Sequence, residues 1–404
     1  MKIAAIITEY NPFHYGHLYQ IEKTREILGD DTAVIAIMSG NFVQRGEPSI
    51  ADKTVRAEVA IECGVNLVLE LPFPYSMSSA EFFARAGVYI AEKIGVVDYL
   101  VFGSEIGDAD SLRRISDNML LPEYKSAIEA LQDSKEHVTL GYPELCELAY
   151  NSVFSDNIPR SFFSSNNILA LEYLKALSAL KSDIKPLTIK RTGADYNDKK
   201  ISDSRIQSAS AIRELANSDL NSALNFIPDS AKNVFYSANK SGKFPTDVSR
   251  LDTAVISNFR LNPTAPSDIH DVAGGLYNRL YDASIKANSI SSLTSMTSTK
   301  KFTQARIRRA IWYSFFGITS SDVRANPAYV QVLAMDLLGR SILKRIKKMC
   351  DLPLITKPSA YKELGDEVVR QKELSRKVDS VFTLTMDLPN SGDFPLTFTP
   401  YVKK

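Results

Sequence analysis

A chain of 404 residues that is 44% hydrophobic and 24% charged has room for two or three packed domains and is not disordered, fibrous or disulfide-rich. No segment has the length and apolarity of a membrane span, and the first seven residues are too short for the apolar part of a signal peptide. Cys63, Cys146 and Cys350 lie far apart without metal-ligand spacing, so we expect reduced thiols in a cytoplasmic protein.

The net charge of +1 hides an asymmetry along the chain. Residues 1–110 hold 8 Lys and Arg against 16 Asp and Glu, whereas residues 297–350 hold 11 Lys and Arg against 2 Asp. An acidic half joined to a basic block is the charge distribution expected of an enzyme that handles a polyanion.

The chain opens with an apolar run over residues 2–8, typical of a central parallel strand covered on both faces. Asn11-Pro12 ends this run in a loop, and an amphipathic helical pattern follows. Gly16 and His17 therefore fall at a strand-to-helix turn, where free N–H groups and the helix dipole favour a bound phosphate. His14 and His17 can stabilise the charge of a phosphoryl or nucleotidyl transfer. A metal pair would need a third His or Cys nearby, and two incidental loop histidines are the plain alternative.

Strand-like and helical patterns alternate through the next hundred residues. Apolar runs at 32–38, 65–71 and 97–102 are separated by helical patterns at 52–63 and 79–94. This alternation of strands and helices predicts a Rossmann-like α/β fold whose parallel sheet binds ligands at the carboxyl ends of its strands. Further along we predict a helix that starts after residues 161–167 and continues to 180, and a strand at 186–190 that leads to Arg191.

From about residue 219 the pattern becomes mostly helical, so we divide the chain into a catalytic domain, 1–218, and a helical region, 219–404. We expect a flexible connector at 289–299, a β-like tail at 378–386, and pairing of 394–402 with the sheet. Aromatic residues at 312–316 can stack on single-stranded RNA bases, but their helical spacing favours a core role. The cations that we expect to contact RNA are Arg306, Arg308, Arg309, Lys344, Arg345, Lys347 and Lys348.

Two short motifs carry a resemblance to a known superfamily. Asn-Pro-Phe-His-Tyr-Gly-His at residues 11–17 resembles the His-x-Gly-His signature of the nucleotidyltransferases, in its usual place after the first strand. Ser-Ala-Ser-Ala-Ile-Arg at 208–213 resembles their second signature, a helix start that grips the triphosphate. Together with the segments at 9–14, 38–48, 102–105 and 165–170, the sequence is similar to the bacterial tRNA(Met) cytidine acetate ligase family over nearly its full length.

The resemblance implies an enzyme that uses ATP, with Mg²⁺, to activate acetate as acetyl-AMP. Such an enzyme then acetylates N4 of the wobble cytidine of elongator tRNA(Met). His14, His17 and Arg213 are implied to be catalytic. The residues implied to bind ATP are Ile7, Thr8, Glu9, Tyr10, Asn11, Pro12, Phe13, His14, Tyr15, Gly16, His17, Leu18, Tyr19, Gln20, Gly103, Asn166, Asn167, Arg191, Ser208 and Ser210.

Ordinary structural roles account for several of these residues as well. Gly103 fits a simple turn, Glu105 a surface charge, and the two asparagines and two serines helix caps. Arg191 and Arg213 are either phosphate-binding groups or solvated surface arginines. For the acetate carboxylate, Arg45 is our hypothesis.

The alternative functions are a metabolite adenylyltransferase, a small-molecule carboxylate–amine ligase and a catalytically silent binding protein. The two alternative enzymes need little beyond the nucleotide-binding core, and they leave the 191 residues after Arg213 without a role. The presence of both histidines and Arg213 argues against a silent protein.

Overall fold

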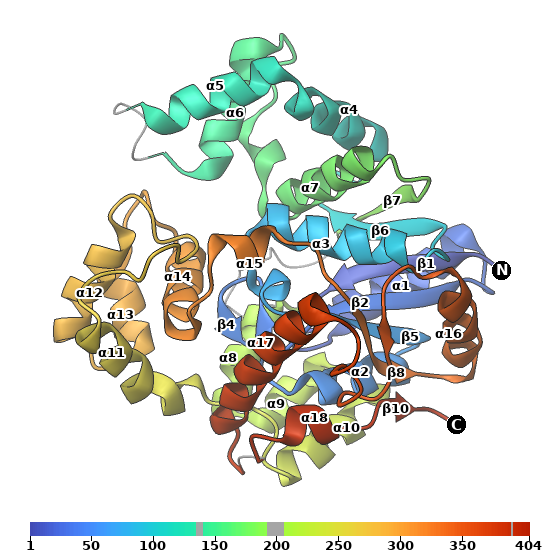
Figure 1. Cartoon of the computed structure of the whole chain (residues 1–404). Helices are drawn as coiled ribbons and strands as arrows, with labels where there is room; N and C mark the ends of the chain where they lie inside the picture. Colours follow the sequence, from blue (N-terminus) through green and yellow to red (C-terminus); the bar gives the residue numbers. More distant parts are fainter. Residues whose placement is uncertain (135–139, 192–205, 389–390) are drawn as a thin grey trace.

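The computed structural model describes residues 1–134, 140–191, 206–388 and 391–404, and an eight-stranded sheet runs through its centre (Figure 1). The strand order is β10-β8-β5-β2-β1-β6-β7, with β9 beside β8. These strands are β1 (Ile3–Thr8), β2 (Ala33–Ser39), β5 (Leu67–Leu71), β6 (Tyr99–Ser104), β7 (Lys185–Lys190), β8 (Val330–Met335), β9 (Leu354–Ile355) and β10 (Tyr401–Val402). A separate antiparallel pair joins β3 (Phe42–Val43) and β4 (Glu47–Pro48).

Five neighbouring strands of the sheet, β5-β2-β1-β6-β7, are parallel, and β8 joins them antiparallel to β5. The carboxyl ends of the parallel strands therefore meet at one edge of the sheet. The segments that follow β1, β2, β5 and β6 lie together at this edge, which is where α/β sheets bind their ligands.

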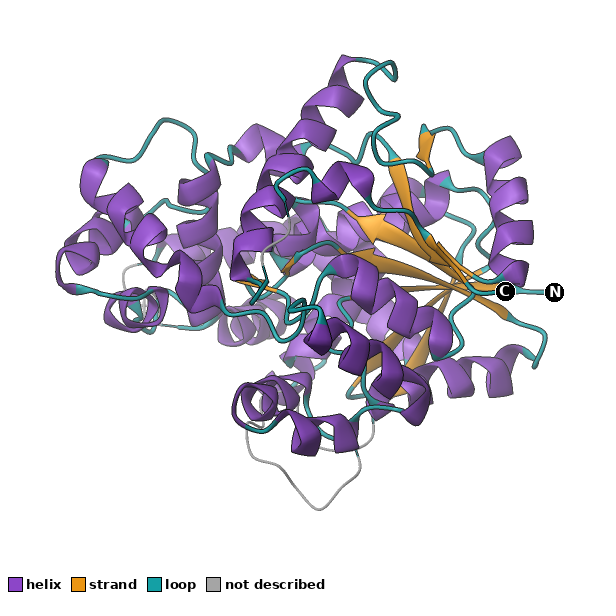
Figure 2. Cartoon of the chain, turned by 90° about the horizontal axis from the view of Figure 1, so that it is seen from below, coloured by secondary structure: helices purple, strands orange, loops and turns teal. Residues whose placement is uncertain are grey.

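Helices cover both faces of the sheet, which is seen from below in Figure 2. Side chains of β1 alternate between the two cores, as the pleat of a strand requires. Ile3, Ala5 and Ile7 pack with α3 (Ala80–Lys93) and α7 (Ser165–Leu180). Ala4 and Ile6 pack with α1 (Tyr15–Leu28), α2 (Lys53–Glu62) and α10 (Asp229–Lys240). Burial on both faces explains why this strand is an almost unbroken apolar run.

Two groups of helices extend from the sheet. Between β6 and α7 the chain forms α4 (Ala109–Leu120), α5 (Pro122–Asp133) and α6 (Tyr142–Val153), at the top of Figure 1. After α8 (Ala209–Ser218), α9 (Leu220–Ala223) and α10, a second group surrounds an apolar core that contains Trp312, Tyr313 and Phe316. Its helices are α11 (Asp252–Leu261), α12 (Leu276–Lys286), α13 (Ile290–Thr297), α14 (Gln304–Phe316) and α15 (Ser320–Arg324).

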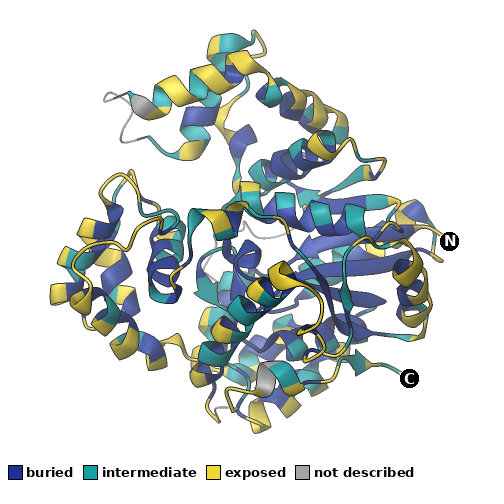
Figure 3. Cartoon of the chain, viewed as in Figure 1, coloured by how far each residue is buried: buried dark blue, intermediate teal, exposed yellow. Residues whose placement is uncertain are grey.

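The chain then returns to the sheet as β8 and continues through α16 (Leu337–Met349), α17 (Asp366–Phe382) and α18 (Phe394–Thr397) to β10. The sheet thus contains strands from both sides of residue 218. Short 3₁₀ helices lie at Tyr75–Met77, Arg160–Phe163, Leu224–Phe226, Val248–Leu251 and Thr383–Thr385. Figure 3 shows the buried strands and inner helix faces in dark blue and the outer helix faces in yellow.

The predicted α/β class with a parallel sheet is confirmed, and the strands predicted at 32–38, 65–71, 97–102 and 186–190 overlap β2, β5, β6 and β7. The core interpretation of the aromatic residues of α14 is also confirmed, because three of the four are fully buried. All three cysteines are free. Within the described ranges, none of the helices has the length and apolarity needed to cross a bilayer.

Two predictions of local structure were wrong. Residues 378–386 are the end of α17 and a 3₁₀ turn instead of a strand. Val378 and Phe382, four residues apart, both enter the core around α14, and this packing outweighs the β preference of the segment. Residues 289–299 contain α13 instead of a flexible connector, because Ser289 and Ser292 form a capping box and Leu293 is buried.

Candidate active site

The turn between β1 and α1 is organised by its two histidines. His14 is the N-cap of α1, and its Nδ1 accepts the backbone N–H of Gly16 at 3.0 Å. Nδ1 of His17 accepts the backbone N–H of His14 at 3.2 Å, and the two ring centroids lie 3.9 Å apart. A Cβ atom on Gly16 would lie 2.8 Å from Cε1 of His14. This arrangement of the two rings therefore requires glycine between them.

Both histidines are neutral hydrogen-bond donors in this turn. Because Nδ1 of each ring accepts a backbone N–H, the proton of each neutral imidazole is on Nε2. Burial, together with the nearby charges of Arg191 and Arg213, lowers the pKa of His14 to about 3. Burial also lowers the pKa of His17 well below its ordinary value. The two Nε2–H groups can donate to an anionic phosphate without carrying charge themselves.

The start of α8 brings the second motif beside this turn. Ser208 is the N-cap of α8, and its Oγ accepts a backbone N–H of the first turn at 3.1 Å. Arg213 donates from Nη1 to the carbonyl of Asn11 at 2.8 Å and from Nη2 to Glu47 at 2.8 Å. Its Nη2 also lies 3.3 Å from Oγ of Ser210. Arg213 is therefore not a solvated surface arginine, and it joins α8 to the loop after β1.

The loop between β3 and β4 forms another wall of the site. The N–H of Gln44 donates to the carboxylate of Glu9 at 2.9 Å. From α14, Arg308 donates to the carbonyl of Arg45 at 3.1 Å, and Arg309 donates to the carbonyl of Gln44 at 3.4 Å. The helical region thus holds the loop that places Arg45 at the site.

Arg56, a fully buried arginine of α2, was missed in the sequence. It donates from Nη1 to the carbonyl of Glu9 at 2.6 Å and from Nε to the carbonyl of Ala51 at 3.0 Å, and Nη2 donates to the carbonyl of Gly40. Burial lowers its pKa to about 10, so it remains charged. It joins the loops that follow β1 and β2. An arginine on the apolar face of the helical pattern at 52–63 is the signal that points to it.

The loop after β6 and the start of α7 are locked together by paired hydrogen bonds. The Glu105 carboxylate accepts Nδ2 of Asn166 at 2.6 Å and the N–H of Asn167 at 2.9 Å. Oδ1 of Asn167 accepts the N–H of Glu105 at 2.9 Å, and its Nδ2 donates to the carbonyl of Phe162. Asn167 is buried among these hydrogen bonds, and the neighbouring Asn166 lines the cavity. Glu105 is a structural partner of α7 and not a solvated charge.

These elements enclose a cavity of about 140 Å³, which continues past the histidines into a hollow of about 50 Å³. The structure brings most of the predicted site residues to its walls. The main cavity is lined by Ile7, Thr8, Glu9, Tyr10, Asn11, His14, His17, Gln20, Arg45, Gly103, Asn166, Arg191, Ser208, Ser210 and Arg213. Gly16 and Tyr19 line the smaller hollow.

Among the residues predicted to bind ATP, Pro12, Phe13, Tyr15, Leu18 and Asn167 line neither hollow in the described part of the chain. Phe13 supports the site instead, because its ring lies 5.4 Å from that of His17. Tyr10 has a left-handed backbone (φ 47°), and its ring packs edge-on against His17 at 4.9 Å. The cavity also has an apolar wall of Phe83, Phe102, Leu169 and Tyr173, which the two motifs did not indicate.

The predicted RNA-contacting cations lie in two different environments. Arg306 and Arg309 of α14 pair with Asp271 at 2.8 and 3.6 Å, and Arg308 is held at the β3–β4 loop. On α16, by contrast, Lys344, Arg345, Lys347 and Lys348 are exposed. The helix α16 lies beside the amino ends of the strands, because Met349 lies next to Gly95, just before β6, and Gly339 packs on Asn66, just before β5. Figure 1 shows α16 beside the N-terminus. The histidines follow the opposite, carboxyl end of β1, so α16 lies at the other edge of the sheet.

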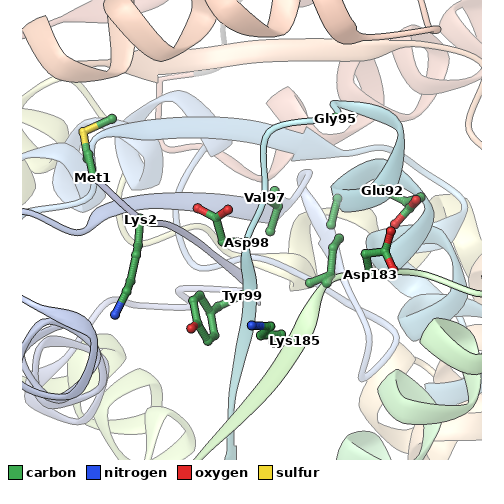
Figure 4. A pocket seen from close by; sticks show the side chains of 11 residues that line it. Met1, Lys2, Glu92, Gly95, Val97, Asp98, Tyr99, Asp183 and Lys185 are labelled. Atoms are coloured by element: carbon green, nitrogen blue, oxygen red, sulfur yellow. The ribbon is translucent and has the colours of Figure 1, made fainter.

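A larger hollow of about 470 Å³ lies at the amino edge of the sheet and is shown in Figure 4. It is open, and two of its charged side chains are engaged in hydrogen bonds to the backbone: Lys2 donates to the carbonyl of Leu28 at 2.9 Å, and Asp98 accepts the N–H of Ile3 at 2.7 Å. Because α/β sheets bind ligands at the carboxyl edge, we assign the site to the smaller cavity beside the histidines.

The fold and the site define a nucleotidyltransferase-type protein, with a parallel sheet and a His-x-Gly-His turn that faces a serine-capped helix. The family model "HIGH Nucleotidyl Transferase" matches residues 1–392. The chain is 40% identical to the tRNA(Met) cytidine acetate ligase of Caldanaerobacter subterraneus subsp. tengcongensis, covering 93% of both chains. It is 37% identical to that of Acetivibrio thermocellus, covering 92% of both.

Solved structures show the same likeness. Apo Thermotoga maritima TmcAL superposes with a TM-score of 0.92 at 29% identity, covering 100% of this chain and 99% of that chain. A second structure of that protein, bound with alpha-thio ATP, superposes with a TM-score of 0.89. The chain belongs to the tRNA(Met) cytidine acetate ligase family within the HIGH nucleotidyl transferases.

Proposed function

We propose that this protein is an ATP-dependent ligase that activates acetate as acetyl-AMP and acetylates N4 of the wobble cytidine of elongator tRNA(Met). The observation that carries the proposal is the cavity in which neutral His14 and His17 lie beside Ser208 and Arg213, in a chain that matches this family over 93% of its length. These substrates place the enzyme in the cytoplasm.

In the first half-reaction an acetate oxygen attacks the α-phosphorus of ATP, and pyrophosphate leaves. The Nε2–H groups of His14 and His17 donate to the phosphate oxygens as negative charge develops. Arg213, Ser208 and Ser210 hold the departing phosphates at the N-terminus of α8, where the helix dipole also favours anions. Arg45, which lines the cavity, binds the acetate carboxylate.

Mg²⁺ is proposed to arrive with the nucleotide as part of the substrate. No group of three or more His, Cys, Asp or Glu side chains that could hold a metal occurs in the described part of the chain. Mg²⁺ in such sites takes many of its ligands from phosphates and water, so a protein cage is not needed. No protein ligand is assigned to the ion.

In the second half-reaction the cytidine amine attacks the acetyl carbonyl, and AMP leaves. Conversion of the carboxylate to a mixed anhydride provides the leaving group, so alignment of the amine supplies much of the rate. The apolar wall of Phe83, Phe102, Leu169 and Tyr173 offers aromatic faces for a base that enters the cavity from a single-stranded loop.

Residues 219–404 are proposed to contribute the RNA contacts outside the cavity. The arginines of α14 are engaged in ion pairs and loop contacts, so the exposed cations of α16 are the stronger group for phosphate contacts. The cations of α16 lie at the opposite edge of the sheet from the cavity. An RNA that reaches both must therefore be much longer than an anticodon loop.

Acetate-dependent ATP–pyrophosphate exchange without RNA tests the activation half of the proposal. We expect exchange with acetate and none without a carboxylic acid. Exchange that needs a phosphate-bearing metabolite instead of acetate would contradict the proposal and support a metabolite adenylyltransferase.

A further inference from the structure

The acetyl transfer releases a proton that the residues assigned so far do not take. The cytidine amine loses one proton as it becomes an amide. His14 and His17 cannot accept it, because each Nδ1 accepts a backbone N–H and each Nε2 carries the ring proton. A protein group that accepts this proton is therefore one of the other side chains that line the cavity.

Glu9 is the only carboxylate among the described residues that line this cavity. Glu47 does not line it and is paired with Arg213 at 2.8 Å. We propose that Glu9 accepts the proton that N4 of cytidine loses when the acetyl group is transferred. This role rests on the proposed function and assigns a catalytic residue to its second half-reaction.

The geometry of Glu9 suits a base. Glu9 is the first residue after β1, and its carbonyl oxygen accepts a hydrogen bond from Arg56 at 2.6 Å. Oε1 accepts the N–H of Gln44 at 2.9 Å, which orients the carboxylate. Oε2 accepts no hydrogen bond from a described residue, so a lone pair is free to accept the amine proton. A carboxylate is also a natural acceptor for the exocyclic amine of cytosine.

The step balances without a further reactant. The N4 lone pair forms a bond to the acetyl carbonyl carbon, and the bond from that carbon to the AMP phosphate oxygen breaks with its electron pair going to AMP. One N4 proton goes to Oε2 of Glu9 and the other stays on the amide. Glu9 returns its proton to water after the products leave.

The charged groups that face Glu9 come from four segments. They are Arg213 of α8, Arg45 of the β3–β4 loop, Glu47 of β4 and Arg56 of α2. Burial raises the pKa of Glu9, Arg213 and Arg45 lower it, and Glu47 raises it. The net result is a pKa above the ordinary value, which makes the deprotonated carboxylate a stronger base.

Glu9→Gln tests the role by separating the two half-reactions. Gln retains an oxygen that can accept the Gln44 N–H but cannot take a proton. In single turnovers, enzyme preloaded with ATP and labelled acetate is mixed with tRNA(Met) transcript, and labelled acetylcytidine is followed in time. We expect this transfer to slow by about 10²–10⁴-fold, the usual contribution of a general base, and acetate-dependent exchange to slow far less.

The pH profile and Glu9→Asp distinguish a base from a structural residue. Wild-type transfer should rise with pH through the raised pKa of Glu9, because only the carboxylate accepts a proton, and Glu9→Gln should lose this rise. A base role predicts faster transfer by Glu9→Asp than by Glu9→Gln, whereas a structural role predicts the reverse, because Gln has the same shape as Glu.

Three results would overturn the role. The first is acetyl transfer by Glu9→Gln at the wild-type rate. The second is an equal loss of pyrophosphate exchange and acetyl transfer in this variant. The third is a transfer rate of Glu9→Gln that still rises with pH as in the wild type. A wild-type enzyme that exchanges pyrophosphate but labels no cytidine would overturn the proposed function, and the role of Glu9 with it. Thermal melting of each variant shows whether it has folded.

Discussion

At the residue scale, the site depends on the way in which backbone groups fix side chains. His14 and His17 each accept a backbone N–H at Nδ1, so both rings present Nε2–H toward the cavity. Arg56 uses its buried guanidinium to join backbone carbonyls of the loops after β1 and β2. The donors are thus in place before substrate binds, which is the condition for strong electrostatic stabilisation of a transition state.

Replacement of His17 by Ala removes one of these donors and the acceptor for the His14 N–H. We expect acetate-dependent pyrophosphate exchange to fall by about 10²–10³-fold, the typical cost of a lost transition-state donor. Glu22→Ala, at an exposed position of the same helix, is the matched control and should keep full exchange. A His17→Ala protein that exchanges at the wild-type rate would remove this histidine from the chemistry.

The low pKa values of the histidines predict the pH dependence of acid activation. His14, with a pKa of about 3, is neutral throughout the range from about pH 5 to 8, and His17 is also shifted downward. Since the neutral donor form persists as the pH rises, exchange should not fall between about pH 6 and 8. A loss of rate centred near the ordinary histidine pKa of about 6.5 would show instead that an imidazolium is required.

At the element scale, α14 and the β3–β4 loop form one unit. Gly46 has a φ of +75°, and a Cβ atom there would lie 2.5 Å from the backbone nitrogen of Arg309. Arg308 and Arg309 hold the neighbouring carbonyls. The sequence showed these arginines only as part of a basic block, because their partners are more than 250 residues away along the chain.

The packing of α14 on this loop is tested by comparing the stability of Gly46→Ala with that of Gly317→Ala. Gly317 has a similar φ of +74° but has no atom within 4 Å of an added Cβ, so its variant measures the backbone strain alone, about 1–2 kcal/mol. Gly46→Ala adds a clash and should lower the free energy of unfolding by about 1–3 kcal/mol more. It should also raise the KM for acetate, because the loop carries Arg45. Equal melting temperatures for the two variants would contradict the close packing of α14 on the loop.

The exposed helix α16 is the element proposed to contact tRNA phosphates. Lys347→Glu/Lys348→Glu should raise the KM for tRNA and make the slope of log affinity against log salt shallower by about 0.7–0.9 for each lost phosphate contact. Exchange without RNA should stay at the wild-type rate. Lys240→Glu/Lys286→Glu, at exposed positions of α10 and α12, makes the same change in net charge. Equal effects of the two pairs on tRNA affinity would mean that α16 makes no specific contact.

The periodicity of the sequence predicted the elements around the nucleotide site, because β1, β2, β5 and β6 are local apolar runs with helices between them. The motif residues of the turn after β1 and of α8 came instead from the resemblance to the two nucleotidyltransferase signatures. The sequence could not distinguish Asn166 from Asn167, because both fit a helix start and only the carboxylate of Glu105 separates their roles. The position of β8 in the sheet was also out of reach, since strand pairing with β5 spans more than 250 residues.

At the scale of the whole molecule, helix α17 is tied to the central sheet by a buried ion cluster. Lys53 Nζ of α2 lies 2.5 Å from Glu70 at the end of β5 and 2.6 Å from Asp379 of α17. Nδ2 of Asn41 donates to Asp379 at 3.0 Å. All four side chains are buried, so each charge depends on its partners. Residues 366–382 therefore stabilise the loop that follows β2.

Asp379→Asn removes one charge from this cluster. We expect the free energy of unfolding to fall by about 3 kcal/mol, as for other broken buried pairs, and the protein to become more sensitive to proteolysis. Asp366→Asn, at the exposed start of the same helix, should have little effect. Equal stability of the two variants in thermal denaturation would show that α17 is not held by this cluster.

Acetate ligation onto tRNA is tested most directly by mass spectrometry of the nucleosides from elongator tRNA(Met) incubated with the protein, ATP, Mg²⁺ and isotopically labelled acetate. We expect labelled N4-acetylcytidine at the wobble position, together with AMP and pyrophosphate. Pyrophosphate without labelled cytidine would contradict the assignment of the RNA acceptor. The absence of both products would contradict acid activation at the cavity of His14 and His17.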